Sequence, residues 1–448
     1  MIKPKLKNLI HAIFIVFVFH SVCLAQVPDS LIHAKFYPFV VDSIVITGNK
    51  ITEEFIILRE LNFEVGDTLT QSNSFYNRER VYSLGIFNHV YFIPTKLDDR
   101  NILLIEIEEG WYIYPIPFVE AKEKDLNKLS YGMFFRLRNF RGRNEDLAAK
   151  IAFGYDPTLF LSYYNPNIIG KENIFIRLTT VYSDVSNKSP SAETIYGDKF
   201  SQKVIGGQFL IGRRFGLFHR LSLTLGFNYI ETPVYIPGIN ASGNRIDNLA
   251  DISLSYEYDT RDLIQFPKNG IYSNLSFAFK GMGIDDINYK VAYLDFREYR
   301  KLVERLIAKW RFASRFTFGD NVPYYDNSIL GVSDKIRGHY DQKYEGRDYL
   351  FSGVEFYYPI VEELNVDLTF IPIIPDQLLS YRLGFYTQIF AETGAASYKN
   401  DPLTFSSFKS GYGAGLTFLI LPYSVLRVDF AFDEYKNLQV VMDVGISF

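Results

Sequence analysis

The side chains of this chain that could carry out chemistry are few and far apart. After the first 25 residues, no metal cluster can be assembled from the spacing of the remaining histidines, which are His33, His89, His219 and His339. The motifs G-x-S-x-G, G-x-x-x-x-G-K-[ST] and H-E-x-x-H do not occur. The glycines of GYGAGL at 411–416 share one strand face and favour close packing over a phosphate cradle. The sequence therefore predicts a protein that is not an enzyme and has no cofactor or metal site.

One arginine in a long polar loop could bind carboxylates. Arg337 and Gly338 lie within DKIRGHYDQKYEGRDY at 334–349. A guanidinium forks onto a carboxylate through two parallel hydrogen bonds, and period-two alternation places Glu392 and Asp429 opposite the apolar faces of their segments. The two carboxylates could instead pair with nearby arginines, namely Arg311, Arg315 or Arg427. Arg337 could equally be a solvated surface charge, and the residues alone leave both readings open.

The elements that would position these residues are strands of alternating character. In RLSLTLGFNY at 220–229, every second residue is Leu, Phe or Tyr and the others are polar or Gly. The same alternation recurs at 251–259, 308–319, 381–392, 423–433 and 439–448. A β-sandwich would also alternate, but apolar faces formed by belts of Phe, Tyr and Leu are typical of lipid-facing girdles. The pattern favours an all-β transmembrane barrel over a sandwich.

The size of this region sets the number of strands. Residues 116–448 number 333, and a tilted strand with its connection takes about 20 residues. We therefore expect about 16 antiparallel strands. The last of them would run to Phe448, on the lipid-facing parity.

The N-terminus has the features of a secretory signal peptide. Lys3, Lys5 and Lys7 precede an apolar run that ends at Ala25, so we expect residues 1–25 to be removed, together with the only cysteine, Cys23. The mature chain would then form no disulfide. Its formal net charge would fall from -4 to -7 with loss of the three lysines, which disfavours a nucleic-acid partner.

A small mixed module is expected between a linker at 26–40 and the barrel. Residues 41–115 predict the order strand, helix, helix, strand, strand, with Thr52 and Ser72 as the helix N-caps. In the last strand, Leu103, Ile105 and Ile107 share the face that would pack against the helices.

These segments together resemble a known family. ITGNKITEEFIILREL and RVYSLGIFNHV resemble a POTRA (polypeptide-transport-associated) domain. RNFRGRNEDL, SYYNPNIIG, YDTRDLIQFPKNGIY, IRGHY and FAETG resemble the barrel of the superfamily that contains BamA, TamA and FhaC, the outer-membrane insertases and transporters. The resemblance covers essentially the whole mature chain. The single POTRA departs from the several that the general assembly factor carries.

The resemblance implies a position for the polar loop. It places the protein in the bacterial outer membrane with the POTRA domain in the periplasm, and counting strands back from Phe448 makes 320–348 an extracellular loop. In the family this loop folds back into the barrel lumen, where its arginine meets carboxylates on the wall. We therefore expect a loop lock formed by Arg337, Gly338, Glu392 and Asp429.

Three functions are then open. The first is an insertase or assembly factor that adds client strands at the seam, meaning the junction of the first strand, expected near 129–138, with the last, near 439–448. Its seam residues would be Tyr131, Phe135, Val441, Gly445 and Phe448. The alternative is a dedicated secretion pore of the two-partner type, gated by the inserted loop. A passive channel has no use for a POTRA domain. The partners implied are unfolded outer-membrane or secreted polypeptides, outer-membrane lipids, and periplasmic chaperones or accessory lipoproteins.

Overall fold

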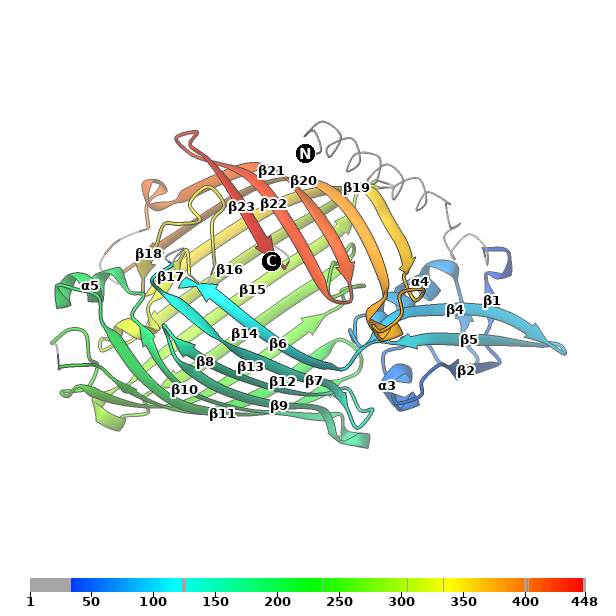
Figure 1. The fold of residues 1–448 in the computed structure, drawn as a ribbon, viewed down its shortest axis with the longest axis horizontal. Coiled ribbons are helices and arrows are strands. Elements are labelled where there is room, and N and C mark those ends of the chain that lie inside the picture. Colours follow the sequence, from blue (N-terminus) through cyan, green and yellow to red (C-terminus); the bar gives the residue numbers. More distant parts are fainter. Residues whose placement is uncertain are drawn as a thin grey trace, which may run out of the picture.

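A computed structural model of the chain describes residues 34–445, apart from 123–125, 236, 304, 333, 399–400 and 402. The predicted signal peptide, His33 and the seam residue Phe448 lie outside the described residues. A small module of helices and strands sits at one end of a large barrel (Figure 1). None of the described helices combines the length and the apolar character that crossing a membrane requires.

The N-terminal module has the predicted order of elements. Its three-stranded sheet has the order β2-β5-β4, with β2 parallel and β4 antiparallel to β5. Two helices cover the sheet, and β1 pairs with β3. Leu103, Ile105 and Ile107 are at most 4% exposed and form its core with the helices. The elements are β1 (Phe39–Val40), β2 (Ser43–Thr47), α3 (Glu54–Leu58), β3 (Thr68–Leu69), α4 (Gln71–Tyr82), β4 (Phe87–Leu97) and β5 (Arg100–Glu109).

Both predicted helix caps are wrong by one or two residues. Glu53 precedes α3 without a side-chain cap, while the Thr52 hydroxyl donates to Glu109 at the end of β5, at 2.7 Å. Thr70, not Ser72, caps α4 by accepting from the backbone N–H of Asn73. The Thr52 hydroxyl is therefore used to join the helix entrance to the sheet.

The rest of the chain forms one antiparallel sheet of 16 strands, in chain order from β6 to β23 except that β19 follows β16. This confirms the predicted barrel. The strands are β6 (Ile113–Ala121), β7 (Leu129–Phe140), β8 (Glu145–Gly154), β9 (Thr158–Ile169), β10 (Ile174–Ser186), β11 (Ser201–Phe215), β12 (His219–Glu231), β13 (Ile246–Asp259), β14 (Gly270–Lys280), β15 (Tyr289–Lys301), β16 (Ile307–Phe318), β19 (Asp348–Asp367), β20 (Ser380–Ser397), β21 (Lys409–Leu421), β22 (Ser424–Asp433) and β23 (Leu438–Val444). A short helix, α5 (Pro190–Tyr196), lies between β10 and β11.

The alternation predicted from the sequence separates the two faces of the wall. On β12, Leu221, Leu223 and Leu225 are 38–44% exposed on the outside, as expected for side chains that meet lipid. On β19 and β22, Glu355 and Asp429 are fully buried inside. The lumen is therefore filled by polar side chains and by chain segments that enter it.

The first strand of the barrel was predicted too late in the chain. The sheet begins with β6 at Ile113, whereas the segment near 129–138 forms β7, the second strand. Pro115 and Pro117 lie within β6. Proline is rare inside strands except at a sheet edge, and β6 lies at such an edge. The two prolines therefore made this segment look like a loop in the sequence, although it forms a strand.

The long loop between β16 and β19 enters the barrel. It contains a short hairpin, β17 (Ser328–Leu330) with β18 (Tyr344–Gly346). Leu330 and Ile336 of the loop are buried in one cluster with Ala313, Tyr349 and Phe351 of the wall. This cluster places the segment around Arg337 against the inner surface of the barrel.

Candidate functional site

Three carboxylates from three wall strands surround Arg337, which is 2% exposed. Nε donates to Glu392 Oε1 at 2.9 Å, and Nη1 donates to Asp429 Oδ2 at 3.2 Å. Nη2 donates to Glu355 and Glu392. The backbone N–H of Arg337 donates to the other oxygen of Glu392 at 2.9 Å, so the main chain is fixed as well as the side chain. We call Arg337, Glu355, Glu392 and Asp429 the loop lock.

Sequence reasoning named three of these four residues and missed Glu355. Glu355 lies on β19, on the same face as Phe351, Gly353 and Tyr357, all of which are buried. The sequence contained this signal, because a carboxylate on a wall strand is expected to face the lumen and not the lipid, and alternation places the apolar Val354 on the other face. The role of the lock in function stays a prediction.

Two glycines give the loop room to approach the wall. Gly338 has φ +96°, and a Cβ there would lie 2.8 Å from the carbonyl oxygen of Phe432. A Cβ on Gly411 of β21 would lie 1.5 Å from the carbonyl oxygen of Arg337. The glycines of GYGAGL therefore allow close packing, as the sequence favoured.

The guanidinium of the loop lock is shielded from water and stacked on an aromatic ring. The guanidinium carbon of Arg337 lies 3.5 Å from the ring centre of Phe390, a geometry that a planar cation adopts over an aromatic face. Glu355 and Asp429 are fully buried. Removing one partner from a buried ion pair leaves an uncompensated charge, which costs about 3–5 kcal/mol. Arg337 therefore holds the loop far more firmly than an exposed arginine would.

The first and last strands of the sheet do not pair with each other. β6 and β23 are the two ends of the strand order, and no ladder joins them among the described residues. Figure 1 shows them, in cyan and red, on the same side of the barrel. This gap between β6 and β23 is the seam as the structure has it.

The predicted seam residues are only partly placed at this gap. Val441 lies on β23 and is 3% exposed, and Gly445 follows directly after that strand with φ +121°. Tyr131 and Phe135 lie on β7, paired with Val119 and Pro115 of β6. Their assignment to the first strand is therefore wrong, because β6 covers them on the seam side.

The two prolines of β6 occupy positions whose backbone N–H groups would otherwise point toward the seam. The N–H of Arg138 donates to the carbonyl of Tyr112, and the N–H of Lys122 donates to that of Lys128. Between these bonds the register is unbroken, so even-numbered residues of β6 bond to β7 and odd-numbered residues point toward the open edge. Pro115 and Pro117 therefore remove two donors from that edge.

The N-terminal module is joined to the barrel by buried charges. Glu60, just after α3, accepts from Arg214 of β11 through both oxygens, at 2.6 and 2.9 Å, and from Arg80 of α4 at 3.0 Å. All three residues are at most 6% exposed.

A second cluster lies beside α4. Glu79 accepts from Arg78 at 2.7 Å and pairs with Arg382 of β20 at 2.9 Å, while Glu363 of β19 pairs with both arginines. We call these two clusters the periplasmic junction: Glu60, Arg78, Glu79, Arg80, Arg214, Glu363 and Arg382. It fixes the module against the rim of the barrel.

The junction should respond to acid. Burial by itself raises the pKa of Glu60, but Arg214, Arg80 and Arg59 together outweigh burial and lower the pKa to about 2. Burial likewise raises the pKa of Glu79, but Arg382 and Arg78, with Lys268, together outweigh it and lower the pKa to about 2. An unfolded glutamate titrates near about 4.3, so the stabilisation is complete above that pH and is lost as pH falls toward 2. We expect the POTRA-to-barrel distance distribution, measured between spin labels on Leu97 and Val303, to broaden over this window.

Single substitutions should distinguish the effect of the junction charges from a general effect of acid on the protein. Glu60→Gln should broaden the same distances already at neutral pH, because Arg214 and Arg80 lose their shared charge. Glu54→Gln, the same change at an exposed position of α3, should behave as the native chain does. Identical distances in all three proteins from neutral pH to pH 2 would contradict this reading of the junction.

The fold and the site together define a class. The class is that of a 16-stranded β-barrel with a loop fixed inside its lumen, one N-terminal module, and end strands that form no ladder among the described residues. Residues 139–448 match the Omp85 superfamily domain, and residues 39–110 match the POTRA family described as surface antigen variable number repeat. The chain belongs to the Omp85 superfamily, as its sequence motifs predicted.

Two solved structures share this fold. BamA from Haemophilus ducreyi lacking POTRA domains 1-3 is 17% identical, with a TM-score of 0.53, and the match covers 91% of this chain and 84% of that one. CdiB from Escherichia coli is 11% identical, with a TM-score of 0.54, and the match covers 91% of this chain and 76% of that one. The protein is accordingly an outer-membrane barrel with its POTRA domain in the periplasm, in a superfamily whose members insert or transport polypeptides.

Proposed function

We propose that the protein inserts polypeptides into the outer membrane by adding client strands at the seam between β6 and β23. The observation that carries this proposal is the absence of a β6–β23 ladder among the described residues. An unpaired strand edge is a template for another strand. The partners of the reaction are unfolded outer-membrane polypeptides and the surrounding lipids, with periplasmic chaperones or accessory lipoproteins delivering clients to the POTRA domain.

Crosslinking the seam tests this function. Val119 of β6 and Val440 of β23 are 74% and 51% exposed on the outside of the barrel. Cysteines at these two positions, joined by a reducible bifunctional reagent, should abolish client insertion, and reduction should restore it. The only native cysteine is Cys23, within the predicted signal peptide.

The control crosslink uses the same β6 position. Val119 and Tyr131 are directly paired between β6 and β7, so a crosslink between cysteines at these positions joins strands that are already neighbours. This protein should insert clients normally. Full activity with a verified Val119–Val440 crosslink would refute the insertase proposal.

A secretion pore is the second candidate, and the inserted loop favours it because a loop inside the lumen can gate the passage of a client. The inserted loop is bonded to the wall through Arg337, so a client crossing the lumen would have to displace the loop. In that case the crosslinked seam should leave transport intact, whereas substitution of Arg337 should change it.

A further inference from the structure

The inserted loop also touches the last strand of the barrel. The backbone N–H of Tyr340 donates to Gln439 Oε1 at 2.9 Å, and Gln439 Nε2 donates to Asp341 Oδ2 at 3.0 Å. Gln439 lies near the start of β23, far from Arg337 in the sequence. One amide side chain thus makes two hydrogen bonds across the lumen, one to the main chain and one to a side chain of the loop.

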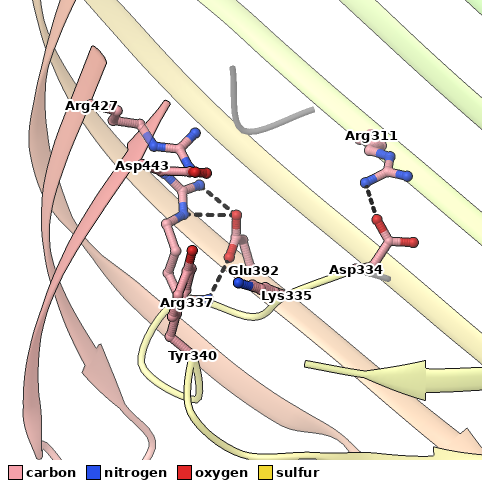
Figure 2. A pocket seen from close by; sticks show the side chains of 8 residues that line it. All are labelled: Arg311, Asp334, Lys335, Arg337, Tyr340, Glu392, Arg427 and Asp443. Carbon is pink, nitrogen blue, oxygen red and sulfur yellow. Dashed lines mark hydrogen bonds and ion pairs between the residues drawn. The ribbon is translucent and has the colours of Figure 1, made fainter. Parts of the chain in front are cut away.

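A second connection runs from the loop lock to the same strand. Asp429 accepts from Arg337 at 3.2 Å and pairs with Arg427 Nε at 2.7 Å, and Arg427 Nη2 pairs with Asp443 of β23 at 3.2 Å. Arg427 is 5% exposed. Figure 2 shows Arg427 and Asp443 beside Arg337, at one side of a luminal pocket that all three residues line. The loop therefore contacts β23 directly at Gln439, and it is connected to Asp443 through two side chains of β22.

β23 has little else to hold it. It is seven residues long and pairs with β22, with no ladder on its other edge among the described residues. The N–H of Gly445 donates to the carbonyl of Val425, and the N–H of Asp433 donates to that of Asn437. Odd-numbered residues of β23 consequently bond to β22, and even-numbered residues face the seam.

We propose that Gln439 and Asp443 are positioning residues through which the inserted loop holds β23 against β22. The position of the loop then controls the seam. While the loop is bound to the wall, β23 is fixed on its luminal side. Withdrawal of the loop frees β23 to move at the seam. The consequence for client insertion rests on the proposed function. The mechanical coupling itself does not, and it can be measured without a client.

A charge placed at Gln439 tests the coupling. Gln439→Glu keeps the acceptor for Tyr340 but sets a carboxylate against Asp341, so the luminal contact is lost. Hydrogen exchange at the amides of residues 439, 441 and 443, which bond to β22, should become about tenfold faster, as expected for the loss of about one or two hydrogen bonds. Adding Asp341→Asn restores a donor opposite the new carboxylate and should return exchange to the native rate.

The control and the contrary outcome are defined on the same protein. Gln208→Glu is the same change on β11, at a position on the face opposite the exposed Phe209 and Ile211, and it should leave exchange in β23 unchanged. Native exchange in Gln439→Glu, or no recovery in the double variant, would overturn the proposal. A crosslinked seam with full activity would refute the insertase function yet leave this exchange result standing, so the two failures are distinguishable.

Discussion

Arg337→Ala is expected to release the inserted loop while the barrel stays folded in the membrane. The substitution removes the buried cation that Glu355 and Glu392 share, and a broken buried ion pair costs about 3–5 kcal/mol. If cleavage follows the population of the open loop, protease cutting within 334–348 on whole cells should rise by about a hundredfold or more. Client insertion should fall in parallel.

Two further variants make this result specific. Arg337→Lys should recover little of the native resistance, because an ammonium cannot reproduce the planar fork that contacts three carboxylates. Arg136→Ala removes another arginine from the wall, one that is bonded to Asp146 of the neighbouring strand β8, and it should leave the loop resistant. Native protease resistance together with native activity in Arg337→Ala would show that the lock does not hold the loop.

The second large effect is expected at the open edge of β6. Pro115→Ala combined with Pro117→Ala supplies two N–H donors toward the seam. Each new ladder bond contributes about 0.5–1.5 kcal/mol, so closure between β6 and β23 should gain about 1–3 kcal/mol. We expect a higher thermal transition, slower exchange at the seam-facing amides of β23, and insertion reduced about tenfold, since about 1.4 kcal/mol is a factor of ten.

The matched control substitutes two residues of β6 whose backbone groups bond to β7 and not toward the seam. Ile116→Ala combined with Phe118→Ala alters two positions that bond to β7, so the seam edge keeps its native donors. Insertion by this variant should remain near the native rate. If the proline variant inserts clients as fast as the native protein, with native exchange at β23, the missing donors do not set the state of the seam.

Most of the barrel could be predicted from alternation, because a lipid-facing side and a luminal side demand opposite chemistry at successive residues. The same argument placed Glu392 and Asp429 inside the wall. It failed at β6, where Pro115 and Pro117 mask a strand that survives because it lies at an edge. A rule that reads proline as a break cannot find a strand whose free edge needs no donor.

The helix α4 shows a different limit. Its apolar residues Val81 and Tyr82 pack into the core of the module. Its charged residues Arg78, Glu79 and Arg80 are also buried, although a charged helix face normally meets water. The barrel partners of Arg78 and Glu79, namely Glu363 and Arg382, lie roughly 300 positions further along the chain, and no local pattern reveals such a pairing.

The periplasmic junction limits how freely this POTRA domain could be transplanted. A homologous domain without the charges of Glu60, Arg78, Glu79 and Arg80 would bury Arg214 against the barrel rim without a counter-ion and would leave Arg382 with Glu363 alone. Uncompensated buried charges are strongly unfavourable, so such a graft would swing away from the barrel even if both parts folded. The domain and its barrel are thus constrained to diverge together, and an exchange between relatives has to carry all seven charges of the junction as one unit.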